Sequence, residues 1–255
     1  MTRKSPNRNT IGNAPGNGSK KTVLAIVLFI MGVAVLAGYY LEKTTIIKKV
    51  DFSGHHFTDP EQLHASISSP VGQHADSIDY RNIMNDVNKL PYVKNSSVSK
   101  GALGNLVISV KEREPIGLIT GNNEQVYFDK EGVQLPLVLE KPVDVPLVYG
   151  FRIASHSDTL SGPEFEQVKN FLKELKNSEL AWITISEVAW NNEDGIVALT
   201  FENGVKLLFG KDNFDRKVKH WEAFYSEIVK TKGIESFRNI DLRFYNQIVA
   251  NEINR

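Results

Sequence analysis

The spacing of hydrophobic and polar residues changes twice along the chain, and each change predicts a different kind of element. Residues 22–41 carry no charge and are mostly apolar, residues 42–114 mix helical and strand spacing, and residues 115–255 follow mostly strand spacing. Helical spacing returns to one face after three or four residues, whereas a strand alternates faces at every residue. The pattern therefore predicts an α+β protein preceded by one long apolar helix.

The first of these segments has the length and composition of a membrane-spanning helix. Residues 23–41 contain no charge, amide or proline, and 11 of the 19 are Leu, Ile, Val or Phe. At about 1.5 Å per residue the helix would be roughly 28 Å long, close to the hydrocarbon thickness of a bilayer. We expect a transmembrane helix over residues 22–41, anchored between Val23 and Leu41. A cleaved signal peptide is the alternative, because Val35-Leu36-Ala37 resembles a cleavage site, although signal cores usually run about 7–15 residues.

The pattern over residues 42–114 predicts two helices and three strands in the order β-α-α-β-β. The first helix follows Thr58-Asp59-Pro60-Glu61, which has the sequence of a capping box with proline in the first turn. Pro91 ends the second helix. A turn at 101–104 joins the last two strands. We expect strands at 46–52, 93–100 and 105–112. We expect the first helix to start at the capping box that begins at 58, and the second helix to cover 83–90.

Residues 115–255 predict a strand-rich domain with two helices. The first helix follows Ser161-Gly162-Pro163-Glu164, a second capping box, and the other covers 214–228. Asp194-Gly195 and Asn203-Gly204 are typical of hairpin turns. We expect strands at 116–120, 125–128, 133–135, 183–188, 196–201 and 205–209, with a last apolar stretch at 240–249.

Charge is unevenly distributed along the chain, although its formal net charge is zero. Residues 1–21 carry +5 and read as a flexible tail, residues 22–41 carry no charge, and residues 42–255 carry −5. Basic flanks stay in the cytoplasm, so the N-terminus is expected inside and residues 42–255 outside. The mixed, slightly acidic outer part favours no nucleic-acid partner. The absence of cysteine excludes disulfides, zinc–thiolate sites and cysteine nucleophiles.

No combination of side chains in the sequence predicts an enzyme. Four of the six histidines fall within 20 positions, but a loop and a separate helix carry them, and we expect no metal site. The segment Ser155-His156-Ser157-Asp158 contains the residue types of a Ser-His-Asp catalytic triad. It lacks the sharp strand-to-helix turn that exposes the nucleophile in hydrolases. Acid pairs such as Asp76 and Asp79 are expected at the surface. We expect no catalytic residue, no cofactor, no metal and no small-molecule substrate. The four clustered histidines are His55, His56, His64 and His74.

Several runs of residues, in a fixed order, carry a resemblance to a known family. The runs are Val50-Asp51-Phe52-Ser53-Gly54, Leu90-Pro91-Tyr92-Val93-Lys94 and 107–115, which ends in Glu112-Arg113-Glu114-Pro115. Residues 42–114 thereby resemble the POTRA domain of the bacterial FtsQ/DivIB cell-division family. Residues 115–255 resemble the family's β domain at 145–150, 204–210 and 240–244. One departure is the turn at 101–104, where the family commonly has an aromatic–proline pair.

The resemblance implies a non-enzymatic component of the division machinery, located at the inner membrane and at the division septum. It implies that the protein links early and late division proteins, helps control septal peptidoglycan synthesis and binds FtsB-like and FtsL-like partners through its last strands. A terminal strand suits this role because its open edge can pair with another chain. Phe244 stands where many members have tyrosine. The implied partner-binding residues are Arg243, Phe244, Tyr245, Gln247, Ile248 and Val249.

Two other functions remain as alternatives. One is an envelope assembly factor or chaperone with a POTRA domain that acts outside division. The other is a membrane-tethered envelope hydrolase, which the residues do not favour because no catalytic set converges. Depletion phenotype would separate division from assembly, and wall-degrading or peptidase activity of residues 42–255 would support the hydrolase.

Overall fold

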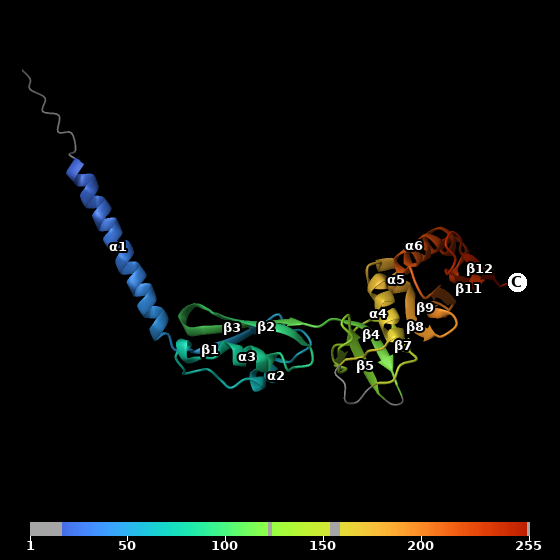
Figure 1. The fold of residues 1–255 in the computed structure, drawn as a ribbon, viewed down its shortest axis with the longest axis horizontal. Coiled ribbons are helices and arrows are strands. Elements are labelled where there is room, and N and C mark those ends of the chain that lie inside the picture. Colours follow the sequence, from blue (N-terminus) through green and yellow to red (C-terminus); the bar gives the residue numbers. More distant parts are fainter. Residues whose placement is uncertain (1–16, 122–123, 154–158, 254–255) are drawn as a thin grey trace, which may run out of the picture. The chain divides into compact units, whose positions relative to one another are not determined.

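The computed structural model describes residues 17–121, 124–153 and 159–253 (Figure 1). They form one long helix, a three-stranded sheet and a nine-stranded sheet, which confirms the predicted α+β class. The chain divides into two compact units. The first contains the long helix, the residues up to Asp51 and the segments Ser69–Tyr80 and Ser99–Val107, and the second contains the rest.

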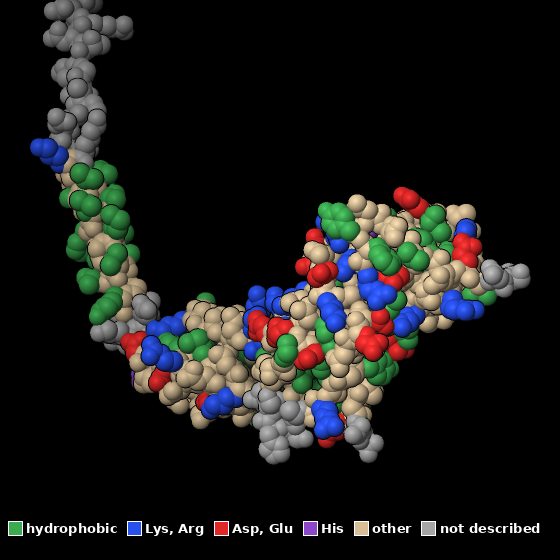
Figure 2. All heavy atoms as spheres, turned by 45° about the vertical axis from the view of Figure 1, so that its right-hand side comes forward, with side chains coloured by type: hydrophobic (Ala, Val, Ile, Leu, Met, Phe, Trp, Pro, Cys, Tyr) green, Lys and Arg blue, Asp and Glu red, His purple; other side chains and the backbone are tan. Residues whose placement is uncertain are grey.

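Helix α1, Asn17–Thr44, contains the one segment of the described residues that is long and apolar enough to cross a membrane, Lys21–Tyr39. The described side chains of this segment are exposed, and Figure 2 shows apolar side chains along the visible face of the helix. The helix begins at Asn17, so residues 17–21 are helical rather than part of a flexible tail. Helix propagation costs little once the apolar segment has nucleated, and lysine is a good helix former. Residues 1–16 of the predicted tail lie outside the described residues.

The predicted β-α-α-β-β order is present after α1. The three strands form a sheet in the order β1-β3-β2. In β3, Leu106, Ile108 and Val110 are buried and alternate with less buried residues, as the strand period requires. The elements are β1 (Lys49–Ser53), α2 (Pro60–Ser66), the 3-10 turn η1 (Ala75–Ser77), α3 (Tyr80–Val87), β2 (Val93–Lys100), the 3-10 turn η2 (Ala102–Gly104) and β3 (Asn105–Glu112).

Neither predicted capping box forms its hydrogen bonds, although both helices start where the boxes place them. Helix α2 has Asp59 as its N-cap, with no side-chain bond and Pro60 at the first helical position. The backbone N–H of Thr58, which Glu61 would satisfy in a capping box, donates instead to the carboxylate of Glu112 at 2.8 Å. Helix α4 has Gly162 as its N-cap, with φ 128°. A tertiary contact therefore replaces the local bond at the first helix.

The remaining strands form one sheet in the order β12-β11-β10-β9-β8-β7-β4-β5-β6. The pairs β4–β7, β7–β8 and β10–β11 are parallel, and the other described pairs are antiparallel. The strands are β4 (Pro115–Thr120), β5 (Gln125–Asp129), β6 (Gln134–Leu135), β7 (Leu147–Tyr149), β8 (Ile185–Asn191), β9 (Gly195–Thr200), β10 (Lys206–Gly210), β11 (Phe237–Asp241) and β12 (Val249–Glu252).

Two long helices accompany this sheet: α4 (Pro163–Lys176) and α6 (Phe214–Phe224). Helix α6 continues through a π-helical turn and leads to β11, which lies parallel to β10, so α6 forms the crossover that a parallel pair requires. Helix α4 packs against α6 and against β4, β8 and β9. The segments after α6 are the π turn η3 (Tyr225–Val229), α7 (Lys230–Lys232) and the 3-10 turn η4 (Ile234–Ser236).

A short helix, α5 (Glu179–Thr184), precedes β8 and was not predicted. Ile183 therefore lies in a helix and not in the predicted strand. The hydroxyl of Ser178 accepts the backbone N–H of Ala181 at 3.1 Å and starts the helix. Thr184 ends it and accepts the indole N–H of buried Trp221 at 2.9 Å. Packing against α6 thus decides the conformation of a segment whose own pattern is ambiguous.

Candidate partner-binding site at the C-terminal strands

Strand β12 lies at one edge of the nine-stranded sheet and has β11 as its neighbour. The two strands are antiparallel, with Asp241 opposite Val249 and Ile240 opposite Ala250. The N–H of Ile253 donates to the carbonyl of Ser236 at 2.9 Å, which fixes the side that faces β11. Because N–H groups alternate sides along a strand, those of Ala250 and Glu252 point to the open side. The edge therefore offers backbone groups to an added strand.

Side-chain contacts hold β12 in place. The ammonium of Lys232 donates to the carboxylate of Glu252 at 2.5 Å, and the amide of Asn251 donates to the side chain of Asn239 at 2.7 Å. Exposed contacts of this kind contribute little individually. Together with the ladder to β11, they keep the edge extended before any partner binds.

Arg243 fastens the segment between β11 and β12 to the sheet. Its Nε donates to Oδ1 of Asp241 at 2.9 Å, its Nη2 donates to Oδ2 at 2.6 Å, and its Nη1 donates to Asp194 at 2.7 Å. The backbone N–H of Arg243 also donates to Asp241, at 3.0 Å. Two-point contacts between guanidinium and carboxylate are among the stronger hydrogen bonds in proteins. Arg243 is therefore committed to contacts inside the protein.

The same contacts set the protonation of the pair. Burial opposes ionisation of Asp241, but the hydrogen bonds and positive charge of Arg243 outweigh burial and lower the pKa of the carboxyl group. The hydrogen bonds to Asp241 in turn raise the pKa of Arg243. Both groups stay charged near neutral pH, so the segment is fixed by a permanent ion pair.

The residues after Arg243 are exposed. Phe244 and Tyr245 are 44% and 71% exposed, and Gln247 is also exposed. The guanidinium carbon of Arg216, on α6, lies 4.1 Å from the centre of the Tyr245 ring. The Nε atom of Arg216 is itself buried and has no hydrogen-bond partner among the described residues. The segment that leads into β12 thus carries an exposed aromatic pair and a neighbouring cation.

The structure places the six predicted partner-binding residues in three settings. Arg243 is held at the surface by Asp241 and Asp194, Ile248 is partly buried against the core, and Val249 begins β12. Phe244, Tyr245 and Gln247 are free to contact another molecule. Sequence reasoning missed Arg216, since only the fold brings α6 beside Tyr245. It also missed Asp194, because nothing in the spacing links a hairpin turn to a residue 49 positions later.

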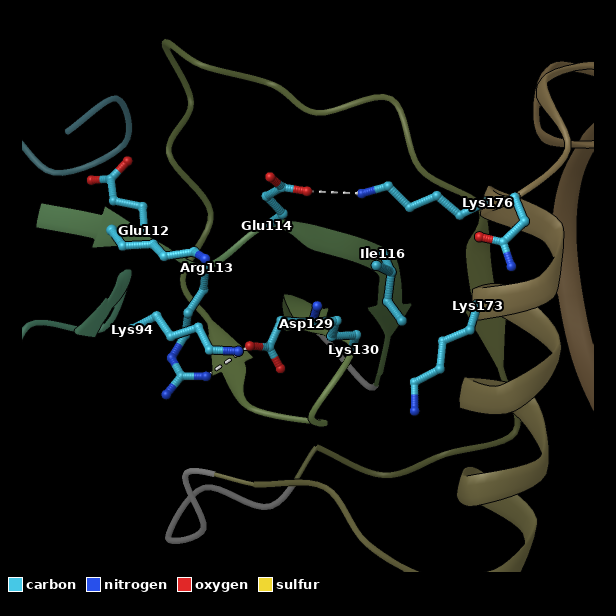
Figure 3. Close-up of a pocket in the computed structure, with 11 residues that line it drawn as sticks. Lys94, Glu112, Arg113, Glu114, Ile116, Asp129, Lys130, Lys173 and Lys176 are labelled. Atoms are coloured by element: carbon cyan, nitrogen blue, oxygen red, sulfur yellow. Dashed lines mark hydrogen bonds and ion pairs between the residues drawn. The ribbon is translucent and has the colours of Figure 1, made fainter. Parts of the chain in front are cut away.

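A second organised region lies where β3 leads into β4 (Figure 3). The carboxylate of Glu112 accepts the backbone N–H groups of His56, Phe57 and Thr58 at 2.6–2.8 Å. Arg113 donates from Nη1 to Asp129, whose side chain is almost completely buried, at 2.8 Å. The Glu112-Arg113 pair of the sequence resemblance therefore has a structural role.

A cavity of about 510 Å³ lies beside this pair, and basic residues supply most of its charged lining. Lys176 reaches Glu114 at 3.2 Å, the contact drawn in Figure 3, and Arg113 and Lys94 contact Glu131. The carboxylates of the cavity are thus engaged with cations or backbone N–H groups.

The histidines and acid pairs singled out in the sequence lie apart from one another in the described part of the chain. No group of three or more His, Asp or Glu side chains there could hold a metal ion. The ring of His64 packs edge-on against Phe52 at 4.9 Å. Asp76 pairs with Lys100 at 3.1 Å on the surface. The Ser155–Asp158 segment lies outside the described residues.

Comparison with known proteins divides the chain in two. Residues 46–113 match the family model described as "POTRA domain, FtsQ-type". Residues 114–251, more than half of the chain, match the model described as "FtsQ/DivIB, C-terminal related". The first match contains the three-stranded sheet, and the second contains the nine-stranded sheet apart from Glu252, the last residue of β12.

Curated relatives cover nearly the whole chain. "Cell division protein FtsQ" of Rhodothermus marinus is 30% identical over 236 residues, which are 88% of this chain and 86% of the relative. The protein of the same name from Salinibacter ruber is 25% identical over 235 residues, 88% of this chain and 90% of the relative.

A solved structure of the major extracytoplasmic domain of the division protein DivIB from Geobacillus stearothermophilus is also similar. It covers 47% of this chain and 97% of its own, with 17% identity and a TM-score of 0.33, which is too low to establish a shared fold. Family assignment therefore rests on the two family models and on the relatives. On these grounds the chain belongs to the FtsQ/DivIB family of cell-division proteins.

Proposed function

We propose that the protein is a non-enzymatic component of the division machinery that binds FtsB-like and FtsL-like partners through β12. It thereby links early and late division proteins at the septum and helps control septal peptidoglycan synthesis. The observation that carries the proposal is the open edge of β12, held extended by Lys232 and flanked by exposed Phe244 and Tyr245. The ordered backbone groups of such an edge supply affinity to an incoming strand, and neighbouring side chains supply selectivity.

The surroundings of the edge favour a partner segment with apolar and acidic side chains. Phe244 and Tyr245 offer aromatic surface of the kind that forms interface hot spots. Arg216, which is partly exposed, adds a cation beside Tyr245. A carboxylate of the partner would suit this position, because a guanidinium favours carboxylate ligands.

The proposal includes a fixed orientation in the inner membrane. Helix α1 acts as the anchor, residues 1–21 stay in the cytoplasm, and residues 42–255 lie on the outer side, where the partners are met. The +5 charge before the apolar segment supports this direction. A reporter fused to the C-terminus that works only outside the cytoplasm, such as alkaline phosphatase, should be active.

Co-purification of the full chain with an FtsB-like protein from membranes tests the partner site. Phe244→Glu should abolish co-purification, because the change places a charge in the aromatic surface and leaves the core untouched. Phe201→Glu is the matched control, since Phe201 is also an exposed phenylalanine, 75% against 44% for Phe244, and lies directly after β9. Retained co-purification of a folded Phe244→Glu protein, or equal loss in both variants, would contradict the edge-strand site. Ile248 is less suitable, because it also packs against the core.

A further inference from the structure

The first unit exposes apolar side chains close to the end of α1. Leu103, in the η2 turn, is 92% exposed, Val71 is half exposed, and Ile46 is 44% exposed. Leu103 also has φ 59°, a backbone conformation that non-glycine residues rarely adopt. A leucine in such a turn gains no packing within the unit that would offset the conformational cost. Packing within the first unit therefore does not explain why an exposed leucine stands at position 103.

Backbone hydrogen bonds fix the loops of Val71 and Leu103 to the residues that follow α1. The N–H of Lys48 donates to the carbonyl of Gly104 at 2.8 Å, and the N–H of Gly72 donates to the carbonyl of Ile47 at 2.8 Å. The N–H of Ala75 donates to the carbonyl of Thr45 at 2.9 Å. Gly104 lies so close to the carbonyl of Ile46 that a Cβ atom would be 2.4 Å from it. Both loops are therefore tied to residues 45–48.

Residues 45–48 cannot lie far from the bilayer if α1 spans it. The apolar part of the helix reaches Tyr39, and the helix ends at Thr44, about 7.5 Å further along its axis. Two extended residues add at most about 7 Å before Ile46. The polar zone of each leaflet is itself about 5–8 Å thick. The two loops thus lie at the headgroups or just beyond them.

The composition of the loops fits this position. Residues 69–73 and 101–104 contain no charged side chain, while exposed Lys48 lies two positions after Ile46. Uncharged loops can enter the interface without losing the hydration of a charge. A lysine beside them can remain at the level of anionic headgroups.

We propose that Leu103, Val71 and Ile46 form a lipid-contact surface that rests on the outer leaflet of the membrane that α1 spans. The occupant is the bilayer because the surface continues directly from the membrane helix. This contact would restrict the first unit at the membrane surface instead of leaving it free on a tether. The proposal rests on the membrane anchor of the proposed function and is independent of the partner site on β12.

Spin labelling of the full chain tests the contact, and the absence of native cysteine makes single sites straightforward. Leu103→Cys, Leu28→Cys and Leu139→Cys are each labelled with a nitroxide in vesicles of phosphatidylethanolamine and phosphatidylglycerol. Leu28 lies within α1, and Leu139 is an equally accessible leucine, 88% exposed, in the second unit. Accessibility is measured to molecular oxygen, which concentrates in lipid, and to a water-soluble nickel chelate.

The labels at Leu28 and Leu103 should be more accessible to oxygen than to nickel, and the label at Leu139 should show the opposite. A water-exposed label at Leu103 with a lipid-exposed label at Leu28 would overturn the contact and leave the anchor intact. A water-exposed label at Leu28 would overturn the anchor and the contact together. A label at Leu103 shielded from both reagents would indicate a protein neighbour, such as a second copy, and would also overturn the proposal. Lipid exposure at Leu139 equal to that at Leu103 would show that the nitroxide enters lipid at any exposed site, and it would also overturn the contact.

Discussion

The guanidinium of Arg216 lies over the ring of Tyr245, with 4.1 Å between the guanidinium carbon and the ring centre. This contact joins helix α6 to the segment between β11 and β12, two parts of the chain with no neighbouring positions in sequence. It presents a cation and an aromatic face at the segment that leads into β12. The arrangement is the feature that distinguishes this edge from an ordinary terminal strand.

Arg216→Ala should weaken partner binding about tenfold or more and change stability little. An exposed cation–π contact contributes about 0.5–1 kcal/mol to folding, whereas arginines at interface centres are frequent hot spots. Binding of a synthetic partner segment to the full chain, followed by calorimetry, measures the effect. Arg216→Lys keeps the charge but not the planar group, and we expect an intermediate affinity. Unchanged affinity for Arg216→Ala would remove this residue from the site.

Arg243→Ala should destabilise the protein by about 1–3 kcal/mol, because Asp241 would lose its hydrogen-bond donors while largely buried. Urea unfolding monitored by tryptophan fluorescence measures this cost. Arg238→Ala, an exposed arginine on β11, serves as control and should change stability by less than about 0.5 kcal/mol. Equal effects of the two changes would show that the Arg243–Asp241 pair does not hold the segment.

Glu112 should make stability depend on pH in the acid range. Burial favours its neutral form, but the backbone N–H groups of Phe57, Thr58 and His56 outweigh burial and lower its pKa below the ordinary value of 4.5. The unfolded chain therefore binds a proton at a higher pH than the folded protein. The stabilisation is fully present above pH 4.5 and is lost as pH falls through the folded-state pKa.

Unfolding free energies between pH 3 and 7 test this. Glu112→Gln should lose about 2 kcal/mol at pH 7, and its difference from the unchanged protein should shrink towards pH 3. Glu114→Gln is the matched control, because Glu114 is exposed and makes one surface ion pair, with Lys176. A constant difference for Glu112→Gln across the pH range would contradict the assigned role of its charge.

Two hairpin glycines should respond differently to alanine. Both have positive φ, 74° at Gly195 and 59° at Gly204. A Cβ at Gly195 would lie 2.3 Å from the backbone carbonyl of Gly210, whereas a Cβ at Gly204 meets open space. Gly204→Ala should cost roughly 1–2 kcal/mol and Gly195→Ala roughly 3 kcal/mol or more. Thermal unfolding of the two variants provides the comparison, and a smaller cost at Gly195 would count against the close approach of the two strands.

Much of the fold follows from local patterns in the sequence. The alternation of Leu106, Ile108 and Val110 predicts β3, and the Asp194-Gly195 and Asn203-Gly204 turns predict the hairpins around β9. These signals are local, so no knowledge of the rest of the chain is needed.

The elements that escaped prediction depend on distant contacts. Helix α5 includes Ile183 because Thr184 meets Trp221, and the first capping box is replaced by the contact from Glu112. At the candidate site, Asp241 and Arg243 are close in sequence, whereas Arg216 and Asp194 reach the segment only through the folded sheet. The sequence resemblance identifies the region, and the structure assigns different roles to its residues.

Amide hydrogen exchange in β12, at single-residue resolution, is the most direct measurement of the proposed edge. In the free protein, the outward N–H groups of Ala250 and Glu252 should exchange fast, while that of Asn251, which faces β11, should be protected. Addition of the FtsB-like partner should slow exchange at Ala250 and Glu252 by at least tenfold and affect Asn251 much less. Partner binding that leaves the exchange of Ala250 and Glu252 unchanged would contradict strand addition at β12.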